Sequence, residues 1–216
     1  MTRALIIKEL RECLPLLALA ALAAAYVLGT LWGVQFTPWD SYEPVSFPFF
    51  GDGFEAPFGL IGPTLAIILG MKQTHWEVMR GTFPYLLYHP MSRRQIMLLK
   101  FAVGGGLLAA GSAAVILLHG IHATKPGVHA FPFFWSMTVP AWKAWFALPL
   151  VYAAAFLSGI RPGRWFGSKL LPLAGGCIAA LALATQPWWW VALVGSAIGT
   201  AACMSAALQV AETRDY

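Results

Sequence analysis

Residues 13–34 read CLPLLALAALAAAYVLGTLWGV, twenty-two positions in a row without a charged side chain. A helix needs about 20 consecutive apolar residues to cross the hydrocarbon core of a bilayer, so this stretch predicts a membrane-spanning helix. The composition of the whole chain agrees. Of its 216 residues 59% are hydrophobic and only 11% are charged, which is too few charges to cover the surface of a soluble globule.

Five further apolar stretches follow, and together they predict an all-α integral membrane protein, one transmembrane domain over residues 1–216. The six predicted membrane helices cover residues 13–34, 56–79, 92–121, 140–160, 168–185 and 188–210. Residues 1–12 combine apolar and charged side chains. They predict a short amphipathic helix that lies in the membrane interface, and the alternative is a simple extension of the first span.

The positive charges divide unevenly between the two predicted sides of the membrane. Twelve of the 14 lysines and arginines lie in the N-terminus, residues 72–100, residues 161–169 and the C-terminus, whereas only Lys125 and Lys143 lie on the other side. Because cytoplasmic loops carry the excess of lysine and arginine, we expect both termini in the cytoplasm and a bacterial-type plasma (inner) membrane as the location. The basic residues flank apolar runs, so the lipid bilayer is the expected partner and nucleic acid is not.

Two loops on the expected outer side carry residues that could bind ions. In the loop 35–55 every charged residue is acidic, which could form a vestibule for cations, although an ordinary solvated loop also fits: Asp40, Glu43, Asp52 and Glu55. The loop near 119–143 carries three histidines, His119, His122 and His129. Two histidines three apart share a helix face and can ligate a metal. No cysteine or carboxylate stands beside them, so we expect interfacial polar residues, with no metal or other cofactor.

Glycines recur at spacings that permit close helix packing. Gly29 and Gly33, and likewise Gly195 and Gly199, are four residues apart, and residues 104–106 are three glycines in a row. Small residues at such positions let two membrane helices approach closely. The pattern predicts helix contacts and says nothing about a substrate.

The segment 74–100, THWEVMRGTFPYLLYHPMSRRQIMLLK, is the longest predicted cytoplasmic connection and is too apolar for a plain loop. Gly81 ends the second membrane helix, Thr82 can begin a short transverse helix, and Pro90 ends that helix. Ser92 and Gln95 then have the spacing of a capping box at the start of the third membrane helix. A short helix held below two spans is suited to a socket on another protein.

This segment resembles the coupling segment of ABC-2-type transporter permeases. The family pattern consists of an acidic residue, Arg-Gly-Thr, Leu-Leu, Pro-hydrophobic-Ser-Arg and a later lysine. Met91, Arg94 and Lys100 of this chain match parts of the pattern. The other matching residues are the predicted coupling residues: Glu77, Arg80, Gly81, Thr82, Leu86, Leu87, Pro90, Ser92 and Arg93. The six spans, the cytoplasmic termini and the interfacial N-terminal helix extend the resemblance over the chain.

The resemblance implies a permease subunit of an ATP-driven transporter, with export as the expected direction. Two such subunits, identical or homologous, would form the pathway, each resting on a cytoplasmic ABC ATPase through its coupling helix. The chain has no G-x-x-x-x-G-K-[ST] phosphate loop, so the ATPase must be a separate partner and the chain is not itself an enzyme. The alternatives are a secondary transporter, an integral membrane enzyme or a structural membrane protein. The scattered acidic residues and the lack of charges well inside the spans disfavour the first two.

Overall fold

The structure is a computed structural model that describes residues 2–37, 48–49, 53–76, 79, 92–127, 131–163 and 168–213. Within these residues the chain is all-helical and contains no strand, as the sequence predicts. Four stretches are long and apolar enough to cross a membrane: Arg3–Leu31, Arg93–Ala123, Trp135–Ile160 and Trp189–Thr213. The predicted helical membrane architecture is thus confirmed at this coarser level.

The helices begin and end close to the predicted bounds, within three residues except at the start of α1 and the end of α2. They are α1 (Thr2–Leu31), α2 (Glu55–Met71), α5 (Arg93–Ala123), α6 (Val139–Ile160), α7 (Leu171–Ala184) and α8 (Trp189–Thr213). A π-helical turn, η1 (Lys72–Trp76), continues α2, and a 3-10 turn, η2 (Trp135–Thr138), precedes α6. The two shorter apolar helices are α2, with 17 residues, and α7, with 14.

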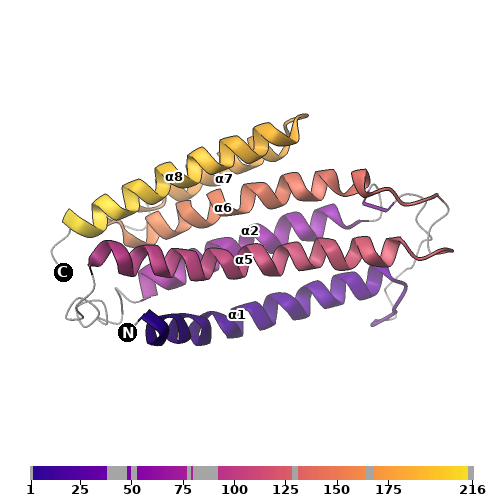
Figure 1. Ribbon diagram of the computed structural model, residues 1–216, viewed down its shortest axis with the longest axis horizontal. Helices are drawn as coiled ribbons and strands as arrows, with labels where there is room; N and C mark the ends of the chain where they lie inside the picture. The colour runs from indigo at the N-terminus through magenta and orange to yellow at the C-terminus, as the bar shows by residue number, and fades with distance from the viewer. Residues whose placement is uncertain are drawn as a thin grey trace.

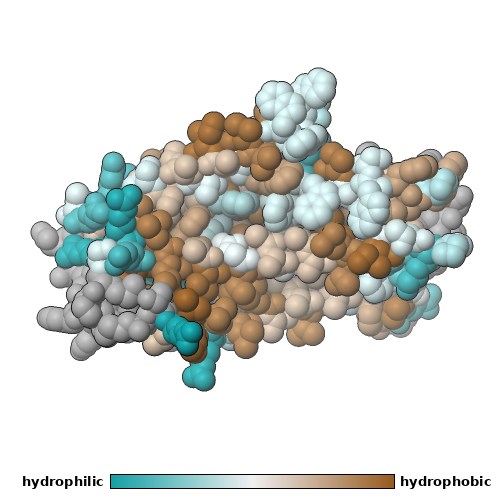
Figure 2. All heavy atoms as spheres, viewed as in Figure 1, coloured by the Kyte–Doolittle hydropathy of each residue, from teal (hydrophilic) through white to brown (hydrophobic). Residues whose placement is uncertain are grey.

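The helices lie side by side in one elongated bundle, in which α1 begins and α8 ends at the same end (Figure 1). Nine described lysines and arginines gather at this end, which we call the basic end: Arg3, Lys8, Arg11, Lys72, Arg93, Arg94, Lys100, Arg161 and Lys169. The opposite end, which we call the far end, carries Lys125 and Lys143. Figure 2 shows hydrophilic side chains at the ends of the molecule and mainly hydrophobic ones between them. This is the distribution that a bilayer requires of its spanning proteins.

Helix α6 is the centre of the bundle. Every residue from Leu150 to Ile160 is buried, because α2, α7 and α8 pack around this part of the helix. Glycines make the close approach possible. A Cβ at Gly70 of α2 would lie 2.7 Å from the carbonyl oxygen of Tyr152, and one at Gly199 of α8 would lie 2.8 Å from a methyl group of Leu150. The close packing predicted for the Gly195/Gly199 pair is therefore confirmed, with Gly195 against Leu183 of α7.

Helix α1 differs from the prediction at its beginning. The expected break between an interfacial helix over residues 1–12 and the first span is absent, because one helix runs from Thr2 to Leu31 with Pro15 inside it. A proline removes one hydrogen bond from a helix interior, but neighbouring contacts can stabilise the helix on both sides of it. The alternative, an extension of the first span, is the arrangement that the structure has.

The end of α1 also changes the interpretation of one glycine motif. Gly33 lies beyond the helix and has a φ of 84°. Its N–H donates to Thr30, and the N–H of Val34 donates to the carbonyl oxygen of Gly29 at 2.9 Å. These two bonds form a Schellman motif, which needs a residue in the left-handed conformation and is most easily made with glycine. Gly33 therefore ends the helix, and the prediction that it packs helices together is wrong.

Two adjacent glycines of α7 provide a test of the packing against α6. A Cβ at Gly176 would overlap the Cβ of Ala154, whereas a Cβ at Gly175 has no neighbour within 4 Å. We expect Gly176→Ala to lower the free energy of unfolding by about 1–3 kcal/mol, because the helices must move apart. Gly175→Ala should leave it unchanged or raise it by up to about 1 kcal/mol, since alanine favours the helix. Unfolding of both variants in detergent measures the difference, and equal effects would contradict the packing.

Candidate functional site

Most of the predicted coupling residues lie outside the described residues, namely Glu77, Arg80, Gly81, Thr82, Leu86, Leu87 and Pro90. Ser92 and Arg93 are described, at the start of α5. The Ser92 hydroxyl accepts a hydrogen bond from the Gln95 N–H at 3.3 Å, and the Ser92 N–H donates to the Gln95 side chain at 3.2 Å. The predicted capping box is confirmed, so α5 begins where the sequence predicts.

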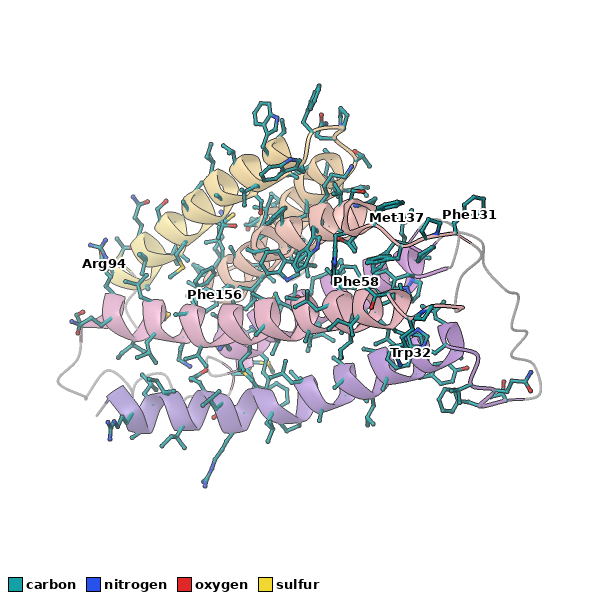
Figure 3. The ribbon with its side chains drawn as sticks, turned by 45° about the vertical axis from the view of Figure 1, so that its right-hand side comes forward. Trp32, Phe58, Arg94, Phe131, Met137 and Phe156 are labelled. Carbon is teal, nitrogen blue, oxygen red and sulfur yellow. The ribbon has the colours of Figure 1, made fainter. Side chains whose placement is uncertain are left out.

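Arg93 connects this start to the end of α8. Its guanidinium donates to the carbonyl oxygens of Ala211 and Glu212 at 3.5 and 3.4 Å. Carbonyl groups in the last turn of a helix carry partial negative charge and attract cations. Arg93 thus has an intramolecular role that sequence reasoning did not find, whereas Arg94 beside it is exposed and lies at the basic end (Figure 3).

An ion pair is buried within the bundle near the basic end. The Lys100 ammonium group lies 2.7 Å from a carboxylate oxygen of Glu9, and the two side chains are 0% and 1% exposed. Each residue lies seven positions inside its helix, which places the pair about 10 Å from the helix ends. Charges so deeply buried are stable only when they are paired and hydrogen-bonded. Glu9 of α1 and Lys100 of α5 therefore fix the relative position of these helices.

Gln73 and Tyr152 complete the surroundings of this pair. The amide nitrogen of Gln73 donates to the second carboxylate oxygen of Glu9 at 3.3 Å and lies 3.0 Å from the carbonyl oxygen of Lys100. Its amide oxygen accepts a hydrogen bond from the Tyr152 hydroxyl, which also lies 3.3 Å from the carbonyl oxygen of Phe101. We call Glu9, Gln73, Lys100 and Tyr152 the polar junction, since they join α1, η1, α5 and α6.

Two backbone features make room for the polar junction. A Cβ at Gly104 of α5 would overlap the side chain of Gln73 and the hydroxyl of Tyr152, so only glycine fits at this position. Gln73 itself lies in the π-helical turn, whose wider spacing is rare and occurs frequently at functional sites. The close contact predicted for the three glycines is therefore present at Gly104, against polar side chains, and at Gly105, against the Tyr152 ring, whereas Gly106 has open space around it.

A second polar contact lies beside the junction, also towards the basic end. The Lys169 ammonium group is 3.0 Å from Nδ1 of His75. An ammonium group can only donate, so Nδ1 of His75 is the acceptor in this contact. This contact joins η1 to the segment before α7.

The side chains of the polar junction attach helices to one another. Its carboxylate is compensated by an ammonium group and an amide, which leaves no general base poised for a buried substrate. Both ends of the segment 77–91 lead into it, since Gln73 precedes this segment and Lys100 follows it. Gln73 and Lys100 thus connect the two helices on either side of this segment to Glu9 of α1.

Sequence reasoning did not find Glu9, Gln73 and Tyr152 as functional residues. It included Lys100 only as the end of the family pattern. The signal available was weak: Lys100 is the last charge before a long apolar run, and Glu9 is one of several charged residues, with Lys8, Arg11 and Glu12, near the start of the first helix. The two are 91 positions apart, so no local spacing indicates that they pair.

The far end of the bundle contains an aromatic cluster around two of the predicted histidines. The His119 ring stacks on Phe54 at a centroid distance of 4.8 Å, and its Nδ1 accepts a hydrogen bond from the Trp32 indole at 3.4 Å. The His122 ring stacks on Trp32 at 4.5 Å. Among the described residues no three His, Cys, Asp or Glu side chains gather as metal ligands do. His119 and His122 thus contribute to aromatic packing, and His129 lies outside the described residues.

Comparison of the chain with protein-family models, curated proteins and solved structures found no match.

Two glutamates in α1 provide a test of the buried ion pair. Glu9→Leu leaves the Lys100 charge buried without its carboxylate, so we expect a loss of about 3–5 kcal/mol in the free energy of unfolding. Glu12 makes an exposed ion pair with Lys8 at 3.8 Å, so Glu12→Leu should cost less than about 1 kcal/mol. Unfolding in mixed micelles measures both. Similar losses for the two variants would show that Glu9 is not buried in a charge pair.

Gly104 provides a test of the room inside the junction. We expect Gly104→Ala to destabilise the protein by about 1–3 kcal/mol, because the added methyl group overlaps Gln73 and Tyr152. Gly106→Ala on the same helix is the control, since a Cβ there has no neighbour within 4 Å. Thermal unfolding of the two variants should separate them. If Gly106→Ala is the more harmful, the junction is not where the structure places it.

Proposed function

We propose that the chain is the membrane-spanning permease subunit of an ATP-driven ABC transporter of the ABC-2 type, working in export. Two such subunits, identical or homologous, form the pathway, and each is driven by a separate cytoplasmic ABC ATPase. The resemblance of residues 77–100 to the coupling segment of this family supports the proposal, as does the capping box at Ser92 that begins the following helix.

The observation that carries the proposal is the connection of the coupling segment to the rest of the bundle. Gln73 and Lys100 flank the segment and both contact Glu9 of α1. A coupling helix needs such an attachment, because the force of ATPase closure must reach helices that lie far from the ATPase.

Six membrane spans with both termini in the cytoplasm are part of the same proposal. The four long helices supply four spans, and α2 with its π-helical continuation covers Glu55 to Trp76, about 33 Å of helix. Helix α7, at about 21 Å, crosses if the bilayer thins or the helix ends are solvated. The basic end then faces the cytoplasm in a bacterial-type plasma membrane, in agreement with the positive-inside tendency.

A secondary transporter is the second candidate, because of the same ion pair. Ionisable residues buried among membrane helices mark proton or ion pathways in many transporters. Glu9 and Lys100 lie near the basic end and compensate each other, which favours the structural role. The two candidates differ in energy source: transport by the ABC permease stops when its ATPase is removed and continues when the proton gradient is collapsed.

The proposal is tested on the charges of the coupling segment. We expect Glu77→Ala and Arg80→Ala to weaken binding of the ATPase at least ~10-fold, since removing one partner of a buried interfacial charge pair costs about 2–5 kcal/mol. Lys125→Ala at the far end removes a charge away from the proposed contact and should bind normally. Co-purification with the ATPase and substrate-stimulated ATP hydrolysis are the measurements. An unchanged interaction in the Glu77 and Arg80 variants, or no ATPase partner at all, would contradict the proposal.

A further inference from the structure

A long cavity lies between α1, α2 and α5, away from the polar junction. Its volume is about 630 Å³, within the range of small-molecule sites in proteins. On α1 and the turn that follows it, the lining extends from Leu17 to Trp32, sixteen residues, or about 22 Å along the helix. The lining of α2 includes Phe58, and Figure 3 shows Phe58 and Trp32 on the far-end side of the bundle. We call this cavity the slot.

The space in the slot results from small side chains. Helix α1 lines it with four alanines, Ala20, Ala21, Ala24 and Ala25, and α5 contributes Gly111, where a Cβ would have no neighbour within 4 Å. Larger side chains at these positions would fill the cavity. Helix α1 is held in place by contacts near its own two ends. Glu9 pairs with Lys100 near one end, and Trp32 contacts His119 and His122 near the other.

The polar groups in the lining already have partners inside the protein. The Ser112 hydroxyl donates to the carbonyl oxygen of Leu108 at 2.6 Å, and the Trp32 indole donates to His119. The other lining residues are leucine, isoleucine, valine, alanine, glycine and phenylalanine. A polar ligand would lose its hydrogen bonds to water without replacing them, so the slot favours a hydrocarbon.

The shape and surroundings of the slot indicate which kind of hydrocarbon fits it. A narrow cavity about 22 Å long matches an extended chain better than a compact ring system. Leu118 lines the slot and is 52% exposed, so the slot reaches the surface among apolar side chains. The neighbouring face of α1 exposes Leu19 and Leu22 by 66% and 69%. In a bilayer this surface meets acyl chains, and these are the molecules that can enter.

We propose that the slot binds one acyl chain of a membrane phospholipid, held between α1 and the pair α2 and α5. The inference concerns the slot alone and does not depend on the proposed transport or on an ATPase. A chain in this place fills the volume that the alanines leave open and supports the middle of α1, whose ends are fixed by polar and aromatic contacts.

The test uses the full chain in liposomes that contain a phosphatidylcholine with a photoreactive diazirine in one acyl chain. Labelling is mapped by mass spectrometry at two residues. Phe58 is 8% exposed and lines the slot, whereas Ile178 of α7 is 70% exposed and reports ordinary contact with surrounding lipid. Although Phe58 is buried, we expect its labelling in the wild type to be within about three-fold of that of Ile178, because a bound chain reaches it.

Filling the slot provides the decisive comparison. Gly111→Leu, and independently Ala24→Leu, should lower labelling of Phe58 at least ~5-fold and leave Ile178 unchanged. Gly106→Leu on the same helix is the matched control, because Gly106 also has open space around its Cβ but does not line the slot. The proposal is overturned if Phe58 is not labelled in the wild type, if both filling variants label it normally, or if Phe58 crosslinks to a second copy of the chain in place of lipid.

Discussion

The buried pair of Glu9 and Lys100 is the constraint on which the arrangement of the helices near the basic end depends. Two charges removed from water must be paired, and their remaining hydrogen-bonding positions must be filled. Gln73 meets the second carboxylate oxygen of Glu9, and the Tyr152 hydroxyl meets Gln73. These contacts determine how four elements lie relative to one another at this depth of the bundle: α1, η1, α5 and α6. They also leave no room for a side chain at Gly104.

The rest of the bundle is built by a different interaction. Helix α6 is surrounded by α2, α7 and α8 and packs through alanines and glycines, so dispersion and close backbone approach stabilise this half. Helix α1 is attached mainly to α5 and α2, by polar contacts at one end and aromatic contacts at the other. Helix α6 is thus the buried centre of the bundle, whereas α1 lies at its side and is held mainly near its two ends. That division suits a permease in which a displaced coupling segment must move a membrane helix.

The helices themselves could be predicted from the sequence, because a bilayer imposes a minimum apolar length and local residues determine the ends. Ser92 and Gln95 are an example, since a capping box involves residues only three apart. The break expected after residue 12 was wrong, because the helix continues through Pro15 and a charged face near the terminus does not by itself end a helix. Gly33 was misassigned because a four-residue spacing of glycines does not distinguish helix packing from a helix end.

The candidate site could be predicted only in part. The local sequence pattern includes Lys100, whereas the partners of Lys100, Glu9 and Gln73, come from α1 and η1. A pairing between Glu9 and Lys100 depends on which helix faces which, and that is decided by packing around Gly70 and Gly104 in three dimensions. The slot depends on the same packing, since alanines in a membrane helix do not reveal whether they face a neighbour, lipid or a cavity.

The most direct test of this account is the coupling free energy between Glu9 and Lys100, measured in a double-mutant cycle of unfolding with Glu9→Leu, Lys100→Met and the double variant. Each single change leaves one buried charge alone, whereas the double change removes both charges and leaves apolar side chains of similar size. The account predicts that the double variant is within about 1–2 kcal/mol of the wild type and more stable than either single variant. Additive losses, with the double variant the least stable of all, would contradict it.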